Sequence, residues 1–231
     1  MLTNIFTVLA LVATAIAAPT LETRGDKPDP SQVTIKGITT SGTGCPQGSV
    51  GKFISSDLTT FTLIFDKYVA SIGPGVATTE SRKFCQINLQ LHYPQGFQYS
   101  IMSTIYRGYA ALDAGVSGTQ EATYYFSGQS NQVSTKSVFK GPLTKDYTIQ
   151  DNIPVTSTIW SQCGADLPIN IKSQISLSTS SKTASGLLTD DSIDGKVTFV
   201  TGYFTPGTPE QREKARLSGD AGLELVGSCG D

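Results

Sequence analysis

The stretch "CQINLQLHY", residues 85–93, alternates apolar and polar side chains over its whole length. Its apolar positions are Cys85, Ile87, Leu89, Leu91 and Tyr93, and its polar positions are Gln86, Asn88, Gln90 and His92. A period of two residues is typical of a strand with one buried face, because successive side chains point to opposite faces of a sheet. His92, the single histidine of the chain, is therefore predicted to lie on the exposed face.

The same alternation recurs in residues 97–105 and 169–178, and turn sequences such as "SIGPGV" and "YPQG" separate further strand-like segments. Many short alternating strands without a helical period before residue 205 predict an all-β fold with disulfides and almost no helix. Because sheets with one apolar face pack in pairs, we expect an antiparallel β-sandwich, with a β-barrel as the alternative.

Two local features of the strand pattern also give predictions. The alternation of residues 97–105 changes phase near Gly108, which predicts a β-bulge at that glycine. Asp194 and Gly195 stand before the strand-like "KVTFV", and this pair is typical of a tight turn.

The two ends of the chain differ from its centre. Residues 1–17 form an apolar run that ends in small residues, which predicts a signal peptide and hence a secreted protein. Residues 18–31 are predicted to be a flexible lead-in and residues 32–205 the secreted β-sandwich domain. Residues 206–231 are unusually charged, and we expect a disordered or weakly helical tail that is not part of the sandwich.

Composition excludes several classes of partner. The net charge is −2 with no block of like charges, so nucleic-acid binding is not expected, and no second apolar run follows the signal peptide to span a membrane. The four cysteines, Cys45, Cys85, Cys163 and Cys229, are an even number in an oxidising compartment. That favours two disulfides over a metal site, and three connectivities are open.

Catalytic residues are hard to find in this sequence. His92 sits among amides on a strand, and no G-x-S-x-G motif supplies a nucleophile for it. Paired carboxylates would allow glycoside hydrolysis, but they must face one another in space. The acidic residues of the strand region are scattered over turns and strand ends, and they include Asp57, Asp66, Glu80, Asp113 and Glu121. A hydrolase with dispersed carboxylates therefore remains an alternative to a binding protein.

Two sets of residues are candidates for ligand binding. Asp190, Asp191 and Asp194 in "TDDSIDG" supply the oxygen ligands that Ca²⁺ prefers, although they lack the spacing of an EF-hand. Tyr106 and Tyr125 are predicted to lie off the core face of their strands, and Tyr109 lies just past the predicted bulge. Exposed aromatic rings at these positions would provide platforms for sugar rings.

Several segments together resemble one family. The pieces "GCPQGS", "TTFTLIFDKYVASIGPG", "SRKFCQINLQLHYPQGFQYS", "YRGYAALDAGV", "TYYFSGQ" and "DSIDGKVTFV" are similar to the secreted fungal and bacterial proteins grouped as domain of unknown function 4360. The resemblance covers about residues 32–200. It implies a small, secreted, cysteine-bridged β domain and lends no catalytic residues.

The resemblance also bears on the cysteines. Cys45, Cys85 and Cys163 match the family pattern, whereas the chain departs from it after Val200 and leaves the role of Cys229 in doubt. Because Cys45 and Cys85 both lie in the matched part, we expect these two to pair.

The sequence thus predicts a secreted β-rich protein, most simply a non-catalytic binding or surface component. The sequence does not identify its partner, for which a cell-wall glycan and another extracellular protein are the candidates. A glycan-binding module is the first alternative and a hydrolase the second.

Overall fold

The computed structural model describes residues 34–56, 60–94, 97–153, 159–162 and 166–201. The predicted signal peptide (1–17), the lead-in (18–31), the charged tail (206–231), Asp57, Cys163 and Cys229 lie outside these residues.

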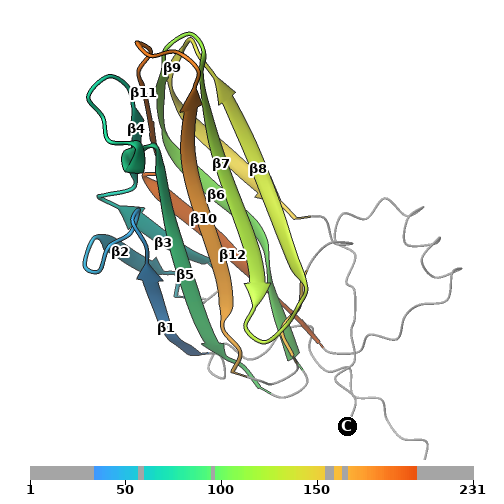
Figure 1. Ribbon diagram of the computed structural model, residues 1–231. Coiled ribbons are helices and arrows are strands. Elements are labelled where there is room, and N and C mark those ends of the chain that lie inside the picture. The colour runs from blue at the N-terminus through green and yellow to red at the C-terminus, as the bar shows by residue number, and fades with distance from the viewer. Residues whose placement is uncertain (1–33, 57–59, 95–96, 154–158, 163–165, 202–231) are drawn as a thin grey trace, which may run out of the picture.

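The described residues form two antiparallel sheets that pack face to face (Figure 1). Sheet A has the order β1 (Thr34–Ser41), β5 (Arg82–His92), β10 (Ile169–Thr179), β7 (Val116–Phe126) and β8 (Gln132–Lys140). Sheet B contains β2 (Val50–Ile54), β3 (Thr60–Phe65), β4 (Val69–Ile72), β6 (Phe97–Leu112), β9 (Leu143–Asn152), β11 (Gly186–Thr189) and β12 (Ser192–Thr201). The helical element η2 is a 3-10 turn, Thr78–Ser81. The predicted β-sandwich is confirmed, and the barrel alternative is wrong.

The core lies between the two sheets and is built from alternate residues of their strands. On β5 the side chains of Cys85, Ile87, Leu89 and Leu91 are fully buried, as the period of two predicts. His92 is exposed on the opposite face, which confirms its predicted orientation. β10 buries Ile169, Ile171, Ser173, Ile175 and Leu177 against the same interior.

The bulge predicted at Gly108 is in the wrong place. Ile101 on β6 pairs with Val197, and Ser103 pairs with the preceding residue, Lys196, so Met102 is the extra residue. From Thr104 to Leu112 the even positions are buried without a break. Gly108 therefore belongs to a regular strand, and a Cβ atom there would lie 2.0 Å from the carbonyl oxygen of Thr189.

The tight turn predicted at Asp194 and Gly195 is also wrong, because both residues lie inside β12. Gly195 pairs with Phe61 of β3, whose ring covers it. A Cβ atom at position 195 would lie 2.3 Å from that ring, so the glycine serves close packing and not a turn.

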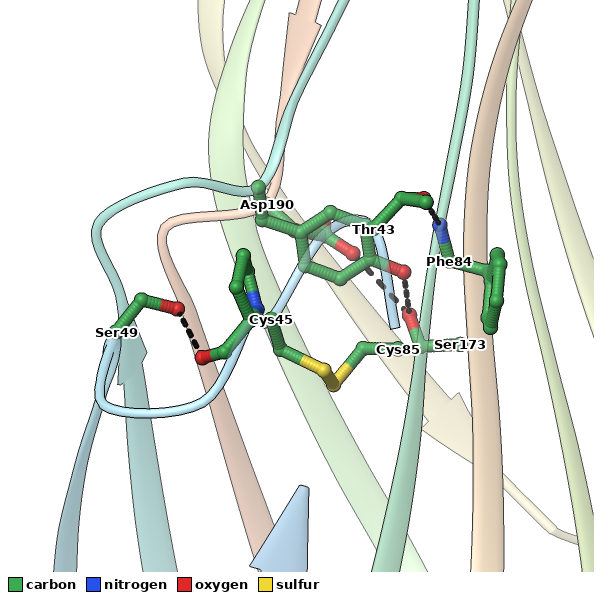
Figure 2. The surroundings of a disulfide bond; sticks show 9 residues. Thr43, Cys45, Ser49, Phe84, Cys85, Ser173 and Asp190 are labelled. Atoms are coloured by element: carbon green, nitrogen blue, oxygen red, sulfur yellow. Dashed lines mark hydrogen bonds between the residues drawn. A yellow bond between two sulfur atoms is a disulfide. The ribbon is translucent and has the colours of Figure 1, made fainter. Parts of the chain in front are cut away.

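The disulfide joins the loop between the sheets to the core. Cys45 bonds to Cys85 with the Cα atoms 5.4 Å apart, which confirms the expected pair. Figure 2 shows how the loop is held beside β5, where Thr43 Oγ1 accepts from the Phe84 amide at 3.2 Å. The bridge therefore fixes the point at which the chain leaves β1 of sheet A for β2 of sheet B.

Replacing both bridged cysteines by alanine should destabilise the domain. The bridge closes a loop with a sequence separation of 40, so the Cys45→Ala/Cys85→Ala variant should lose about 4 kcal/mol of unfolding free energy in the chain-entropy model. Equilibrium unfolding in guanidinium chloride measures the loss. The reduced wild type is the control and should lose at least as much, because reduction opens every disulfide of the chain. A loss below about 1 kcal/mol in both would contradict this role.

Candidate functional site

A row of polar side chains crosses the outer face of sheet A. Thr39, Asn88, Asn170, Tyr125 and Gln132 lie in register on β1, β5, β10, β7 and β8. Their positions share the face of His92 and oppose the buried face. Neighbouring strands lie about 4.8 Å apart, so the five side chains form a continuous band across the sheet.

The amides at the centre of this row are held in place by one another. Asn170 Oδ1 accepts from Gln86 Nε2 at 3.2 Å and from Asn88 Nδ2 at 3.1 Å, while Asn170 Nδ2 donates to Ser127 Oγ at 2.9 Å. Asn170 is only 7% exposed although it faces outward. The side-chain oxygens Gln86 Oε1 and Asn88 Oδ1 accept no hydrogen bond from the described residues. They remain available to a ligand in fixed positions.

A second polar row lies one step along the strands. Ser41, Gln86, Lys172, Thr123 and Ser134 are again in register on the same five strands. The hydroxyls of Thr123 and Ser134 are hydrogen-bonded at 2.9 Å.

A cluster of charged side chains lies on the outer face of sheet A, at the C-terminal end of β5 where His92 stands. Asp166 accepts from His92 Nδ1 at 2.7 Å and also pairs with Lys36. These two hydrogen bonds, led by that of Lys36, hold the pKa of Asp166 below its usual range. All three side chains are exposed, so the cluster is a surface network of charged groups.

The outer face of sheet A contains a hollow beside η2, at the N-terminal end of β5. The hollow has a volume of about 650 Å³ and is lined by Thr43, Thr78, Thr79, Ser81, Arg82, Phe84, Lys172 and Gln174. A smaller hollow of about 400 Å³ lies between β1 and β2 and is lined by Thr39, Thr40, Ser41, Gly42, Gln47, Gly48, Val50 and Lys52. Neither contains an aspartate or a glutamate, so neither has the paired carboxylates of a glycoside hydrolase.

The interior holds two carboxyl groups that join the sheets. Tyr147 of β9 donates to Asp190 Oδ1 at 2.6 Å, and Ser173 of β10 donates to Asp190 Oδ2 at 3.3 Å (Figure 2 shows the bond from Ser173). Burial raises the pKa of Asp190 to about 7. Asp151 of β9 accepts from Tyr124 of β7 at 3.1 Å, and burial raises its pKa as well.

The candidate calcium ligands Asp190, Asp191 and Asp194 do not converge in the structure. Asp190 is buried, Asp191 is exposed, and Asp194 accepts from Thr62 at 2.7 Å and pairs with Arg107. No group of three or more potential metal ligands occurs in the part of the chain that the structure describes.

The three predicted platform tyrosines do not form a row. Tyr106 is fully buried and bonds to Tyr124 Oη at 2.8 Å, because the bulge at Met102 turns it into the core. Tyr109 lies half-buried on the outer face of sheet B, and Tyr125 lies half-buried on the outer face of sheet A. Tyr125 alone joins the polar row, next to Asn170.

The neighbours of Tyr125 in the polar row, Asn88 and Asn170, were not predicted from the sequence as site residues. The alternation of residues 85–93 and 169–178 already places Asn88 and Asn170 outward. The signal that brings them together is the pairing of β5 with β10 and of β10 with β7, which join strands far apart in the sequence.

The two packed sheets and the Cys45–Cys85 bridge define a disulfide-bridged antiparallel β-sandwich. A family model described as "Domain of unknown function (DUF4360)" matches residues 31–204, so the chain belongs to this family. A protein of Arthroderma benhamiae named "Uncharacterized secreted protein" is 55% identical over 170 residues, which cover 74% of this chain and 69% of that protein. The predicted secretion is thereby confirmed, and the chain is a secreted protein.

Two solved structures are distantly similar to this chain. TmCBM61 in complex with β-1,4-galactotriose is 12% identical, with a TM-score of 0.27 over 71% of this chain and 89% of that one. The enzymatically active domain of tailspike protein 4 from bacteriophage CBA120 is 16% identical, with a TM-score of 0.23 over 73% of this chain and 20% of that one. In the described residues, no helix is long and apolar enough to cross a membrane.

The domain should be more stable in mild acid than in mild base. Burial raises the pKa of Asp190 from 3.8 to about 7. The stabilisation of the folded state by the protonated carboxyl group is therefore full below pH 4 and is lost as the pH rises through 7. The free energy of unfolding should therefore fall by a few kcal/mol between pH 5 and pH 8. Asp190→Asn, which cannot ionise, should remove most of this fall. An equal slope in both proteins, measured by denaturant unfolding, would contradict the assignment.

Replacing the histidine should leave the fold intact. The His92 side chain is 49% exposed and its partner Asp166 is also at the surface, so His92→Gln should shift the thermal midpoint by less than about 2 °C. A thermal melt followed by circular dichroism measures this. A fall of many degrees would show that the exposed cluster stabilises the domain more than a surface ion pair does.

Proposed function

We propose that the protein binds glycans through the outer face of sheet A, without a catalytic step. The observation that carries this proposal is the in-register row of Thr39, Asn88, Asn170, Tyr125 and Gln132. A polysaccharide chain presents hydroxyl groups at regular intervals, and a band of fixed polar side chains across five strands offers a matching series of donors and acceptors.

The chemistry of the row suits sugars better than it suits a protein surface. Side-chain amides supply a donor and an acceptor at one position, as a sugar hydroxyl does. Tyr125 adds an aromatic ring that accepts the apolar face of a sugar. Protein interfaces, in contrast, are built around clusters of buried aromatic and aliphatic side chains.

The preformed hydrogen bonds of the row support binding further. Asn170 is nearly buried and bonds to Gln86, Asn88 and Ser127. The rotamers of these amides are therefore ordered before a ligand binds. Binding then loses little side-chain conformational entropy.

The outer face of sheet B is different in character. Phe53 of β2 is 60% exposed and Ile64 of β3 is 43% exposed, and they lie on adjacent strands of that face. Two of its charged residues, Arg107 and Asp194, pair with each other. The in-register row through Phe53 on this face holds one amide, Gln150, whereas the row through Asn88 on sheet A holds three, so the proposal assigns the glycan to sheet A alone.

The proposal predicts retention of the secreted protein on at least one insoluble polysaccharide among chitin, β-glucan, cellulose and cross-linked pectin. Asn88→Ala/Tyr125→Ala should weaken that retention about tenfold or more, because it removes an ordered amide and the aromatic ring together. Depletion isotherms measure the change, and circular dichroism checks that the variant is folded.

Tyr109→Ala is the matched control, because Tyr109 is a half-buried tyrosine on the outer face of the other sheet. It should bind as the wild type does. Failure of the wild type to bind any of the four polysaccharides, or equal losses in the control and the double variant, would contradict the proposal.

A further inference from the structure

We propose that the hollow beside η2 receives the carboxylate of an acidic sugar unit, so that the preferred ligand is a glycan containing uronic acid. This inference rests on the proposed function and assigns its ligand class. The hollow continues the amide face directly, since Lys172 both lines it and occupies the second polar row next to Gln86. A glycan chain on the polar rows therefore reaches the hollow without leaving sheet A.

Arg82 is held in an orientation suited to a carboxylate. Its Nε and Nη2 atoms both donate to Gln174 Oε1, at 2.9 and 2.5 Å, and Gln174 is a neutral partner. Within the described residues the guanidinium makes no ion pair, and its remaining N–H groups are available in a fixed plane. A planar, anchored guanidinium is well matched to the two oxygens of a carboxylate.

Lys172 places a second cation in the same hollow. Phe84 of β5 is paired with Gln174 of β10. Arg82 lies two residues before Phe84 on β5, and Lys172 lies two residues before Gln174 on β10. Because the two strands are antiparallel, the two cations lie on opposite sides of this pair. Lys172 is exposed and makes no ion pair within the described residues. The two cations thus flank the centre of the hollow from both sides.

The rest of the lining fits a sugar ring. Phe84 is 39% exposed between the cations and offers an apolar surface. The rim carries the hydroxyls of Thr43, Thr78, Thr79 and Ser81, which match the hydroxyls of a sugar. An aromatic surface with hydroxyls and cations accommodates a ring that bears both hydroxyl and carboxylate groups.

The outer face of sheet A as a whole carries more cations than carboxylates, which also favours an anionic ligand. Its described cations are Lys36, Arg82, Lys136, Lys140 and Lys172, and its carboxylates are Glu121 and Asp166. The chain as a whole has a net charge of −2, so positive charge is concentrated on this face. Glu121 lies in register with Lys136, and Glu80 of η2 pairs with Lys83, so the nearby carboxylates face other cations. Such a field favours an anionic polysaccharide.

Affinity electrophoresis in gels that contain soluble polysaccharide tests this assignment. Polygalacturonate should retard the secreted protein about tenfold more strongly than its highly methyl-esterified form, which has the same backbone without the charge. Arg82→Gln/Lys172→Gln should abolish this preference while keeping the fold. Lys136→Gln/Lys140→Gln removes the same charge from the same sheet outside the hollow, and it should retain most of the preference.

Equal losses in the two double variants, or stronger retardation by dextran sulfate than by polygalacturonate, would show a general charge effect and overturn the inference. Binding to neutral glycans that depends on Asn88 and Tyr125, without a preference for the acid form, would overturn the inference and leave the proposed function standing. Binding to the acid form that is insensitive to Asn88→Ala/Tyr125→Ala would support the hollow and contradict the amide row.

Discussion

The two-residue period of β5 and β10 is the constraint on which both the core and the proposed binding face depend. Ile87 and Leu89 of β5, and Ile169 and Ile171 of β10, are fully buried against sheet B. Because successive side chains alternate, this burial obliges the residues between them to face outward. A shift of one residue in register would exchange the amides for the core, so the apolar side chains that stabilise the sandwich also fix the polar row.

The interior adds a second, polar link between the sheets. Tyr68 donates to Ser173 Oγ at 3.1 Å, Ser173 reaches Asp190, and Tyr147 reaches Asp190 from the far edge of sheet B. The Ser173–Asp190 bond lies beside the Cys45–Cys85 bridge, where the chain crosses from one sheet to the other (Figure 2). A buried network stabilises a fold when its members are satisfied. It therefore holds sheet A in one position relative to sheet B, which keeps the outer face regular.

The fold could be predicted from the sequence further than the site could. The alternation in residues 85–93 gave the correct face for His92, and the family resemblance gave the Cys45–Cys85 pair. The bulge at Met102 and the packing of Phe61 on Gly195 could not be predicted, because they depend on partner strands distant in the sequence. The same reason hid the row at Asn88, Asn170 and Tyr125: periodicity tells which way a side chain points, and only strand pairing tells what lies beside it.

Mapping the ligand on the folded protein tests the central claim most directly, since the claim is about one face of one sheet. We would titrate tetragalacturonate and chitotetraose separately into the isotope-labelled protein and follow its backbone amide signals by nuclear magnetic resonance. The account predicts that at least one of the two shifts the signals of β5, β10 and β7 and leaves those of β2 and β3 unchanged. Shifts confined to β2 and β3 would contradict it, as would the absence of any shift at millimolar concentration in a protein that is retained on chitin or cross-linked pectin.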